Sequence, residues 1–273
     1  MTSFLINSYW FAAGVDVDAL AYINAVETAD GQALETGVKD AIIAFVVGCK
    51  ADGIWTAIKA SCILAGARTL SGALVPLVGT APTNNNFVSG DYNRETGLLG
   101  NGSTKYLNSN RNNNADPQNS KHGVVYVSSN HTSRSSGASN NFPAFLGTGA
   151  NATGAFVYGR LSDNSTSFFA RANNGTADTP SGANTASGLT GISRSASASY
   201  TFRTSGSSST ITRTSETPYD GAIGVFREGA GAATATTYSN ARLAFYSIGE
   251  SLNLSLLDSR VSTLLTAYAA AIP

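Results

Sequence analysis

Apolar residues near the start of the chain recur with the spacing of an α-helix. The residues that fall on one face at i, i+3, i+4 and i+7 are Ala19, Tyr22, Ile23 and Val26. Asp16 and Asp18 precede this stripe, and aspartate is one of the residue types that cap a helix N-terminus. The pattern predicts a first helix over residues 18–29, ended by Asp30 and Gly31.

A second stripe of apolar residues follows at nearly four-residue spacing. Its members are Leu34, Val38, Ile42, Phe45 and Cys49. This stripe predicts a helix over residues 32–48, and Ile54, Trp55 and Ile58 indicate a short third helix after the turn at 52–53. We therefore expect residues 1–79 to form a helical region that serves attachment or assembly.

From about residue 80 to residue 250 the helical period gives way to short runs of β-branched and aromatic residues. Examples are residues 123–128, 199–203 and 242–248, and clusters of Gly, Asn and Ser separate such runs. No long helical pattern intervenes to supply the crossovers that parallel strands need. The pattern predicts a mainly β fold, an antiparallel β-sandwich of two packed sheets over residues 80–250.

The last part of the chain, residues 251–273, returns to a helical period. Its apolar face consists of Leu257, Val261, Leu264, Leu265 and Tyr268. A C-terminal helix with this face is expected to pack on the sandwich or on a neighbouring subunit.

The composition argues against nucleic-acid-binding and membrane-inserted proteins. The 273 residues include 17 basic and 17 acidic residues, and only 12% are charged, about half the roughly 25% that is usual. A neutral chain without a Lys or Arg run lacks the basic surface that a nucleic-acid-binding protein needs for phosphate contacts.

The apolar runs of the chain are shorter than the roughly 20 residues that span a bilayer. No basic residue precedes the apolar Phe4, Leu5 and Ile6, so no Sec signal and no membrane insertion are predicted.

Residues that carry catalysis or bind metals are scarce. Cys49 and Cys62 lie in apolar surroundings without a Cys-x-x-Cys spacing, and we expect buried free thiols. His122 and His131, the two histidines, lie in polar segments and are expected to be exposed or to cap turns. None of the zinc-type spacings, nucleophile elbows or nucleotide-binding loops is complete.

Carboxylate pairs are a further candidate for catalysis, because β-sandwiches can carry glycoside hydrolysis on two neighbouring acidic residues. None of the six glutamates has a carboxylate two residues away, as an alternating strand motif would require. Glu216 and Asp220 are the closest pair, and Pro218 between them indicates a turn. Because no such pair is found, we predict that the protein is not an enzyme and that it has no catalytic residues.

Two polar segments are candidates for ligand binding. Asp91, Tyr92 and Asn93 form one, and Asn112 to Asp116 form the other. Their oxygen atoms suit Ca²⁺, although Asx side chains also make turns by bonding their own backbone, and that explanation needs no metal. No cofactor is predicted, with Ca²⁺ as the open alternative.

Aromatic residues that stack on sugar faces are the other binding candidates, and Tyr106 joins the ligand-binding set for this reason. The remaining candidates by residue type are Phe142, Tyr158, Tyr200 and Tyr219. Most strand aromatics in a sandwich belong to the core, so no sugar site is localised by sequence.

Three stretches resemble structural proteins of tailed bacteriophages. ADGIWTAIKA (51–60) and LAGARTLSGALVPL (64–77) resemble a recurrent module of those proteins. DYNR (91–94), with residues 97–98 and GNGSTKYL (100–107), resembles the opening strands of the attached concanavalin A-like sandwich. AFYSIGESL (244–252) is similar to the closing strand and helix of the same family.

The resemblance implies a concanavalin A-like, lectin-like jelly roll on a virion structural protein made in the bacterial host cytoplasm. Such proteins lie on the virion surface as capsid decorations, head fibres or tail appendages. Implied partners are other virion proteins of the capsid, portal or tail, further copies of the chain, and a host-surface glycan. The alternative is a carbohydrate-binding adhesin such as a tail fibre, and the third hypothesis is a polysaccharide depolymerase.

Overall fold

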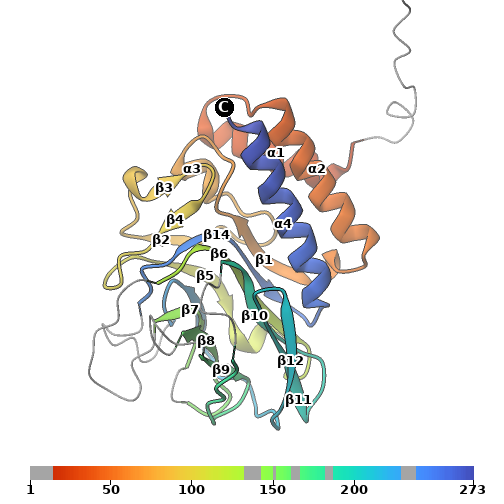
Figure 1. Ribbon diagram of the computed structural model, residues 1–273, viewed down its shortest axis with the longest axis vertical. Coiled ribbons are helices and arrows are strands. Elements are labelled where there is room, and N and C mark those ends of the chain that lie inside the picture. The colour runs from red at the N-terminus through yellow and green to blue at the C-terminus, as the bar shows by residue number, and fades with distance from the viewer. Residues whose placement is uncertain (1–14, 132–142, 150–151, 161–166, 182–186, 229–237) are drawn as a thin grey trace, which may run out of the picture.

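The computed structural model describes residues 15–131, 143–149, 152–160, 167–181, 187–228 and 238–273. Within these ranges two antiparallel sheets pack face to face, and three long helices lie together on one side of them (Figure 1). The predicted mainly β fold, an antiparallel β-sandwich with helical ends, is confirmed.

The larger sheet has eight strands in the order β12-β11-β10-β6-β14-β4-β3, with β1 also paired to β14. These strands are β1 (Ile58–Ile63), β3 (Tyr92–Asn93), β4 (Gly97–Leu99), β6 (Lys121–Ser129), β10 (Gly188–Arg194), β11 (Ser199–Thr204), β12 (Ser207–Thr212) and β14 (Arg242–Gly249). Here β6 and β14, more than a hundred residues apart in sequence, are neighbours in the middle of the sheet.

The smaller sheet has six strands in the order β2-β5-β13-β7-β8-β9. They are β2 (Thr83–Asn85), β5 (Tyr106–Asn112), β7 (Ala144–Thr148), β8 (Phe156–Arg160), β9 (Phe168–Ala172) and β13 (Ala222–Val225). Side chains of alternating residues from both sheets fill the space between them, among them Val125, Val127, Phe145, Phe202 and Tyr246, all 1% exposed or less. This interior is the first hydrophobic core.

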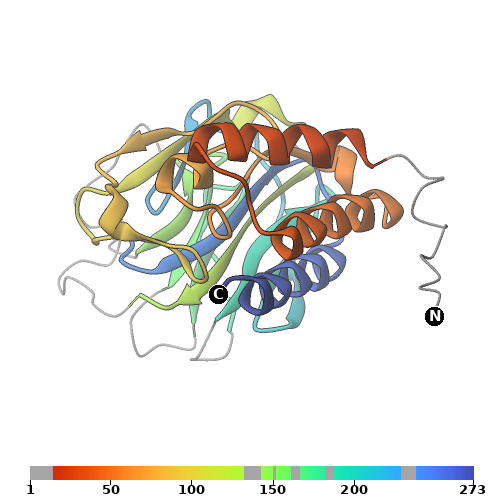
Figure 2. The same ribbon diagram turned by 90° about the horizontal axis from the view of Figure 1, so that it is seen from above.

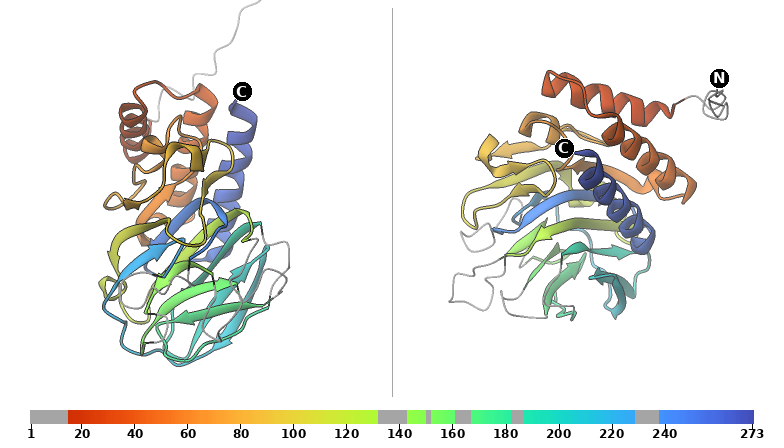
Figure 3. Two further views of the ribbon diagram at one scale, coloured as in Figure 1. Left: turned by 90° about the vertical axis from the view of Figure 1, so that its left-hand side faces the viewer. Right: turned by 45° about the horizontal axis from the view of Figure 1, so that its top comes forward.

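A second core lies between the outer face of the larger sheet and the helices α1 (Val17–Asp30), α2 (Thr36–Ala51) and α4 (Leu254–Ala271). The predicted apolar stripes of all three helices are buried there, against Val124, Leu189 and Phe245 of the sheet. Figures 2 and 3 show the helices as one layer over this sheet. We call these three helices the helical layer.

Short elements complete the chain. They are α3 (Leu70–Ala73) and the 3₁₀ turns η2 (Trp55–Ala57), η3 (Ser89–Asp91) and η4 (Asn113–Ala115). The short helix predicted around residues 54–58 corresponds to η2, a single 3₁₀ turn. No helix within the described ranges is long and apolar enough to cross a bilayer.

The helix ends follow from their capping residues. The Asp16 side chain accepts hydrogen bonds from the backbone N–H groups of Asp18 and Ala19, and Gly31 ends α1 in the left-handed conformation with φ 68°. The Asn253 side chain caps α4 in the same way as Asp16 caps α1. The first helix lies within one residue of its predicted ends, whereas α2, which has no side-chain cap at Glu35, begins four residues later than predicted.

One strand within residues 1–79 was not predicted. β1 pairs with β14 along its length, so the helical region and the sandwich share part of one sheet. The register shifts between Ile58 and Ala60, and at this point Gly249 approaches the β1 backbone closely. A Cβ atom added to Gly249 would lie 2.0 Å from the carbonyl oxygen of Ala57. Only glycine fits there without a shift of the backbone.

Candidate ligand-binding groove

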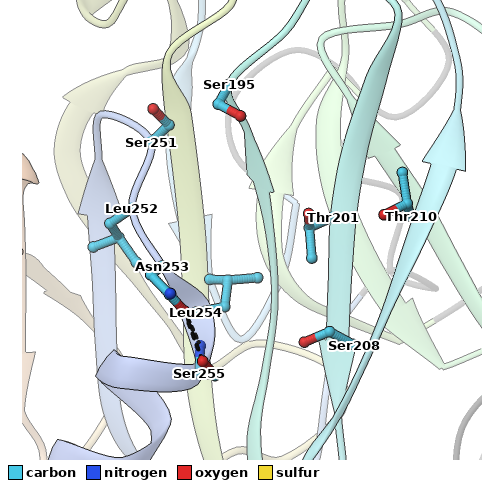
Figure 4. A pocket seen from close by; sticks show the side chains of 9 residues that line it. All are labelled: Ser195, Thr201, Ser208, Thr210, Ser251, Leu252, Asn253, Leu254 and Ser255. Atoms are coloured by element: carbon cyan, nitrogen blue, oxygen red, sulfur yellow. Dashed lines mark hydrogen bonds between the residues drawn. The ribbon is translucent and has the colours of Figure 1, made fainter.

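A groove of about 490 Å³ lies between the β11–β12 hairpin and the segment that leads into α4 (Figure 4). It is lined by Ser195, Thr201, Ser208, Thr210, Ser251, Leu252, Asn253, Leu254 and Ser255. We call these nine residues the hydroxyl groove, because six of them are Ser or Thr. Its volume is within the roughly 300–1,000 Å³ range of ligand pockets.

The hairpin wall is fixed by a two-residue turn. Ser205 and Gly206 both have positive φ values, 49° and 76°, and join β11 directly to β12. Such a turn matches the right-handed twist of the flanking strands. The resulting register places Thr201 opposite Thr210 on the face of the sheet that carries the helical layer.

The opposite wall is the segment 251–255, which is held down by side chains of β10 and of the loop before β6. Leu252 donates its backbone N–H to the Ser193 hydroxyl at 3.2 Å, and its carbonyl accepts the Ser193 O–H at 2.9 Å. Ser251 donates its N–H to the Ser120 hydroxyl, also at 3.2 Å. Asn253 then begins α4 by accepting the N–H groups of Ser255 and Leu256 at its Oδ1. The wall is thus positioned by these five hydrogen bonds before any ligand arrives.

His122 supports this wall from beneath. It is completely buried, with Nδ1 2.5 Å from the Glu250 carbonyl oxygen and Nε2 2.8 Å from the Ser247 hydroxyl. Since a carbonyl only accepts, Nδ1 carries the proton and Nε2 accepts from Ser247. Burial lowers the pKa of His122 to about 4, so the ring is neutral at physiological pH. The prediction of an exposed histidine is wrong for His122 and for His131, which is also buried. The His131 ring accepts the backbone N–H of Asn240 at Nδ1, at 3.0 Å.

One end of the hydroxyl groove borders a buried ion pair. Arg203 donates from Nε to Asp258 Oδ2 of α4 at 2.8 Å and from Nη1 to the Ser208 hydroxyl at 3.0 Å. Arg203 and Asp258 are each 9% exposed. The pair therefore ties the hairpin to α4 and orients one hydroxyl of the groove.

The groove presents uncharged hydrogen-bonding groups that have no protein partner. Among the described residues, the hydroxyls of Ser195, Thr201 and Thr210 and the amide Nδ2 of Asn253 make no hydrogen bond. Leu252 and Leu254 supply apolar contact surface beside them. None of the nine lining residues titrates. Chemically, the arrangement suits a neutral ligand that is rich in hydroxyl groups.

The first predicted ligand-binding segment is engaged within the protein. Asp91 pairs with Lys105 and accepts the N–H of Val88 at 2.8 Å. Tyr92 donates its O–H to the Ala67 carbonyl at 2.7 Å. Asn93 Oδ1 accepts from the backbone of the two residues that follow Arg94, which makes an Asx turn.

The other predicted residues lie apart from that segment and have separate roles. Tyr106 lies under the Arg227 guanidinium, 4.0 Å from it, and meets Tyr238 edge-on at 6.1 Å. Asn112 donates to Asp220 at 3.1 Å, and the buried Asp116 pairs with Arg111 and Lys121. None of the predicted residues lines the hydroxyl groove.

The remaining predictions concern aromatic residues, metal ligands and the two cysteines. Tyr158 and Tyr200 are buried in the first core, and Phe142 lies outside the described residues. Within the described ranges no group of three or more His, Cys, Asp or Glu side chains is placed to hold a metal ion. Cys49 and Cys62 are free and buried, as predicted, and burial raises the pKa of each thiol to about 12.

The groove residues were missed because Ser and Thr are abundant throughout this chain. A usable signal was present in residues 207–212, where five of the six residues are Ser or Thr and the expected apolar stripe of a buried face is absent. The Ser-Gly pair at 205–206 also marks the hairpin turn. Neither signal indicates that residues 251–255 form the opposite wall.

No family model and no curated protein matches the chain. Among solved structures, it is similar to Trypanosoma rangeli sialidase in complex with 2,3-difluoro-KDN, at 12% identity and a TM-score of 0.46, over 77% of this chain and 33% of that one. It is also similar to the binding domain of botulinum neurotoxin serotype D, at 9% identity and a TM-score of 0.48, over 76% of this chain and 51% of that one. The chain thus spans about a third of the sialidase and about half of the toxin chain.

The prediction that the protein is not an enzyme is contradicted by this comparison, because the similar structures include sialidases, which are enzymes. The absence of a paired acidic strand motif was too narrow a criterion, since it tests one kind of active site only. At these identities and TM-scores the likeness assigns no activity, ligand or partner to this chain.

Proposed function

We propose that the protein binds carbohydrate through the hydroxyl groove and that it does so at the surface of a tailed-phage particle. The observation that carries the first part is the groove itself, where three hydroxyls and one amide without partners among the described residues face a cavity whose described lining carries no charge. A neutral segment of a surface polysaccharide offers matching donors and acceptors, and its C–H faces suit the two leucines.

The binding test measures saturable binding of neutral oligosaccharides, presented as a panel and then in titrations. Thr201→Val and Thr210→Val each remove one groove hydroxyl with little change of shape. We expect each variant to weaken binding about 5- to 10-fold, the effect of roughly 1 kcal/mol for a hydrogen bond. Thr212→Val is the matched control, since Thr212 lies on the same strand but outside the groove lining.

Binding that is unchanged by both groove variants, or reduced equally by Thr212→Val, would refute the groove as the binding site. The polysaccharide is also analysed for chain length after incubation. Shortening of the polymer would favour the depolymerase hypothesis over binding alone.

The virion location rests on the resemblance of residues 51–77, 91–107 and 244–252 to phage structural proteins. The proposal includes capsid, portal or tail proteins as partners and further copies of the chain in a homo-oligomer. Localisation of the protein on intact particles by cryo-electron microscopy tests it. Density at capsid positions supports a decoration or head fibre, density at the tail supports an adhesin, and absence from the particle refutes the virion proposal.

A further inference from the structure

The strand β12, at the end of the larger sheet, has no neighbour on its outer side among the described residues. It pairs with β11 along its whole length and stands last in the order of strands (Figure 1). Five of its six residues are exposed. Proteins normally protect such an edge with a lysine, a proline, a bulge or a cover. The sequence of β12, SSSTIT, contains neither lysine nor proline, and its register with β11 has no bulge.

The main-chain groups of every second residue of β12 point away from β11. Directly opposite residues of an antiparallel pair alternate between bonded and non-bonded pairs. The N–H of Arg213 donates to the Ala198 carbonyl at 2.8 Å, so this pair, just beyond the strand, is a bonded one. Ser208, Thr210 and Thr212 therefore belong to the non-bonded pairs. Their N–H and C=O groups face the open edge, and none of these groups bonds another described residue.

The other strands that end a sheet in the described part of the chain are short or covered. β3 has two residues and β2 has three. The outer sides of β1 and β9 are bridged, by Val78 and by Asp178 respectively. A contact between the sheet edges of two copies therefore uses β12 on both sides. This is the isologous arrangement of a two-fold dimer.

We propose that β12 pairs with β12 of a second copy, antiparallel and with the two Thr210 residues opposite each other. In this register Ser208 of each copy lies opposite Thr212 of the other copy. The three outward residues of each strand then form three bonded pairs, and each pair exchanges two hydrogen bonds. The pairing satisfies every open N–H and C=O group of these residues on both strands, whereas a register shifted by two residues leaves some of them unpaired.

The side chains of β12 favour contact between identical copies. A two-fold axis at Thr210 brings this residue next to its own copy, where a charge would repel itself, and β12 is uncharged throughout. Threonine pairs are among the favourable cross-strand contacts. The charged residue that follows the strand, Arg213, is paired with Asp178 of the same chain. Edge pairing alone buries less than the roughly 1,600 Å² of a standard interface, so we expect a reversible dimer.

The two-fold contact also joins two hydroxyl grooves. Ser208 and Thr210 line the hydroxyl groove, and opposite residues of a strand pair project from the same face of the sheet. The two Thr210 side chains therefore lie between the two grooves. The joined groove suits a polysaccharide longer than one groove alone can hold. This use of the contact rests on the proposed carbohydrate binding, whereas the contact itself does not.

Analytical ultracentrifugation of the full chain, at concentrations up to about 1 mM, tests the contact. We expect a reversible equilibrium between monomer and dimer. Thr212→Pro removes an outward N–H but no hydrogen bond to β11, and it should weaken dimerisation at least about tenfold. Thr212→Val keeps the N–H and is the matched control, which should dimerise like the unmodified protein. Circular dichroism checks that both variants are folded.

Two charge variants test the register without a proline. Thr210→Lys and Thr210→Glu each bring two like charges together across the two-fold axis, so each variant alone should be monomeric. An equimolar mixture of the two should recover the dimer, because opposite charges then meet. A monomeric unmodified chain, a dimer that Thr212→Pro leaves unchanged, or a mixture that stays monomeric would each overturn the proposal.

Binding measurements separate this contact from the proposed function. Thr212 lies outside the groove lining, so Thr212→Pro should bind a short neutral oligosaccharide like the unmodified protein. The same variant should bind the long polysaccharide at least about tenfold more weakly, because it loses the second groove. A dimer that binds no oligosaccharide would refute the proposed function and support the contact alone. Equal affinity of Thr212→Pro and the unmodified protein for the polysaccharide would overturn the joined groove.

Discussion

The larger sheet changes its chemistry where the helical layer ends. Beneath α1, α2 and α4 its outer face consists of side chains such as Val124, Leu189 and Phe245, which are buried against the helices. On the next two strands, β11 and β12, which follow β10 at the edge of the sheet, the same face carries Thr201 and Thr210.

The covered region obtains its stability from burial, whereas the uncovered region leaves its hydrogen-bonding groups available to a ligand. In a chain with few charges, the ion pairs of the helical layer also join distant segments, as between Arg260 and Asp52. The hydroxyl groove lies along the boundary, and its residues belong partly to each region. Substitutions along that boundary separate stability from binding.

The largest effect is expected from Asp258→Ala, which breaks the connection between α4 and the hairpin. The substitution leaves the buried Arg203 without its carboxylate partner. Removal of one member of a buried ion pair costs about 3–5 kcal/mol, and urea-induced unfolding measures this loss. The double variant Arg203→Met with Asp258→Leu should recover most of the stability. If the double variant is as unstable as Asp258→Ala, the loss comes from helix packing and not from the unpaired charge.

The second effect is a pH dependence that arises from His122. Its pKa is lowered from 6.5 to about 4 in the folded protein, so the unfolded chain binds a proton first as the pH falls. The stabilisation is therefore complete above pH 6.5 and is lost as the pH falls towards 4, by about 3 kcal/mol in total. Burial is the main cause of the lowered pKa.

Unfolding free energies measured between pH 6.5 and pH 4.5 check this dependence before most carboxylates titrate. His122→Gln, which retains an amide donor for the Glu250 carbonyl, should flatten the slope. An NMR titration of the His122 ring provides the control on the folded state. A midpoint near pH 6.5 in that titration would contradict the burial of the ring.

The third effect concerns the connection between the helical region and the sandwich. Gly249→Ala places a methyl group against the Ala57 carbonyl, where β1 meets β14. Forced overpacking of this kind costs about 1–3 kcal/mol, measured as a shift of the unfolding midpoint in urea. Gly90→Ala is the control, because a Cβ at Gly90 has no atom within 4 Å. Equal stability of the two variants would show that β1 adapts to the added methyl.

The helices were predictable because each packs one face only, so that residues such as Tyr22, Phe45 and Leu264 recur with the helical period. β1 was missed because Ile54 and Ile58 also fit a helical period, although the polar Lys59 and Ser61 alternate with apolar residues along the strand. Five of its six residues are buried, so the alternation does not mark a solvent-exposed face. The predicted ligand residues Asp91 and Asn93 were chosen for their oxygen atoms, and the fold uses those atoms in a salt bridge and a turn.

The groove itself depends on contacts that no local pattern encodes. Thr201 and Thr210 become neighbours through a hairpin, which the Ser-Gly turn indicates. Their position opposite Asn253 depends on where α4 begins relative to β10, and Ser193 sets that position through its two bonds to Leu252. Composition added no signal, since the hydroxyl side chains resemble those of the rest of the chain.

The smallest effect on stability, and the sharpest separation of the two roles, is expected at Asn253. Its Oδ1 caps α4, while its Nδ2 faces the hydroxyl groove without a partner. Asn253→Ala removes the cap and should cost about 1 kcal/mol of unfolding free energy. Asn253→Asp keeps a capping oxygen at a helix N-terminus, where a negative charge is favourable, so its stability should stay within about 0.5 kcal/mol of the unmodified protein. The same variant loses the amide donor, and oligosaccharide titration should show weaker binding at unchanged stability. If Asn253→Asp binds as well as the unmodified protein, the amide contributes nothing to recognition, and Asn253 serves the helix alone.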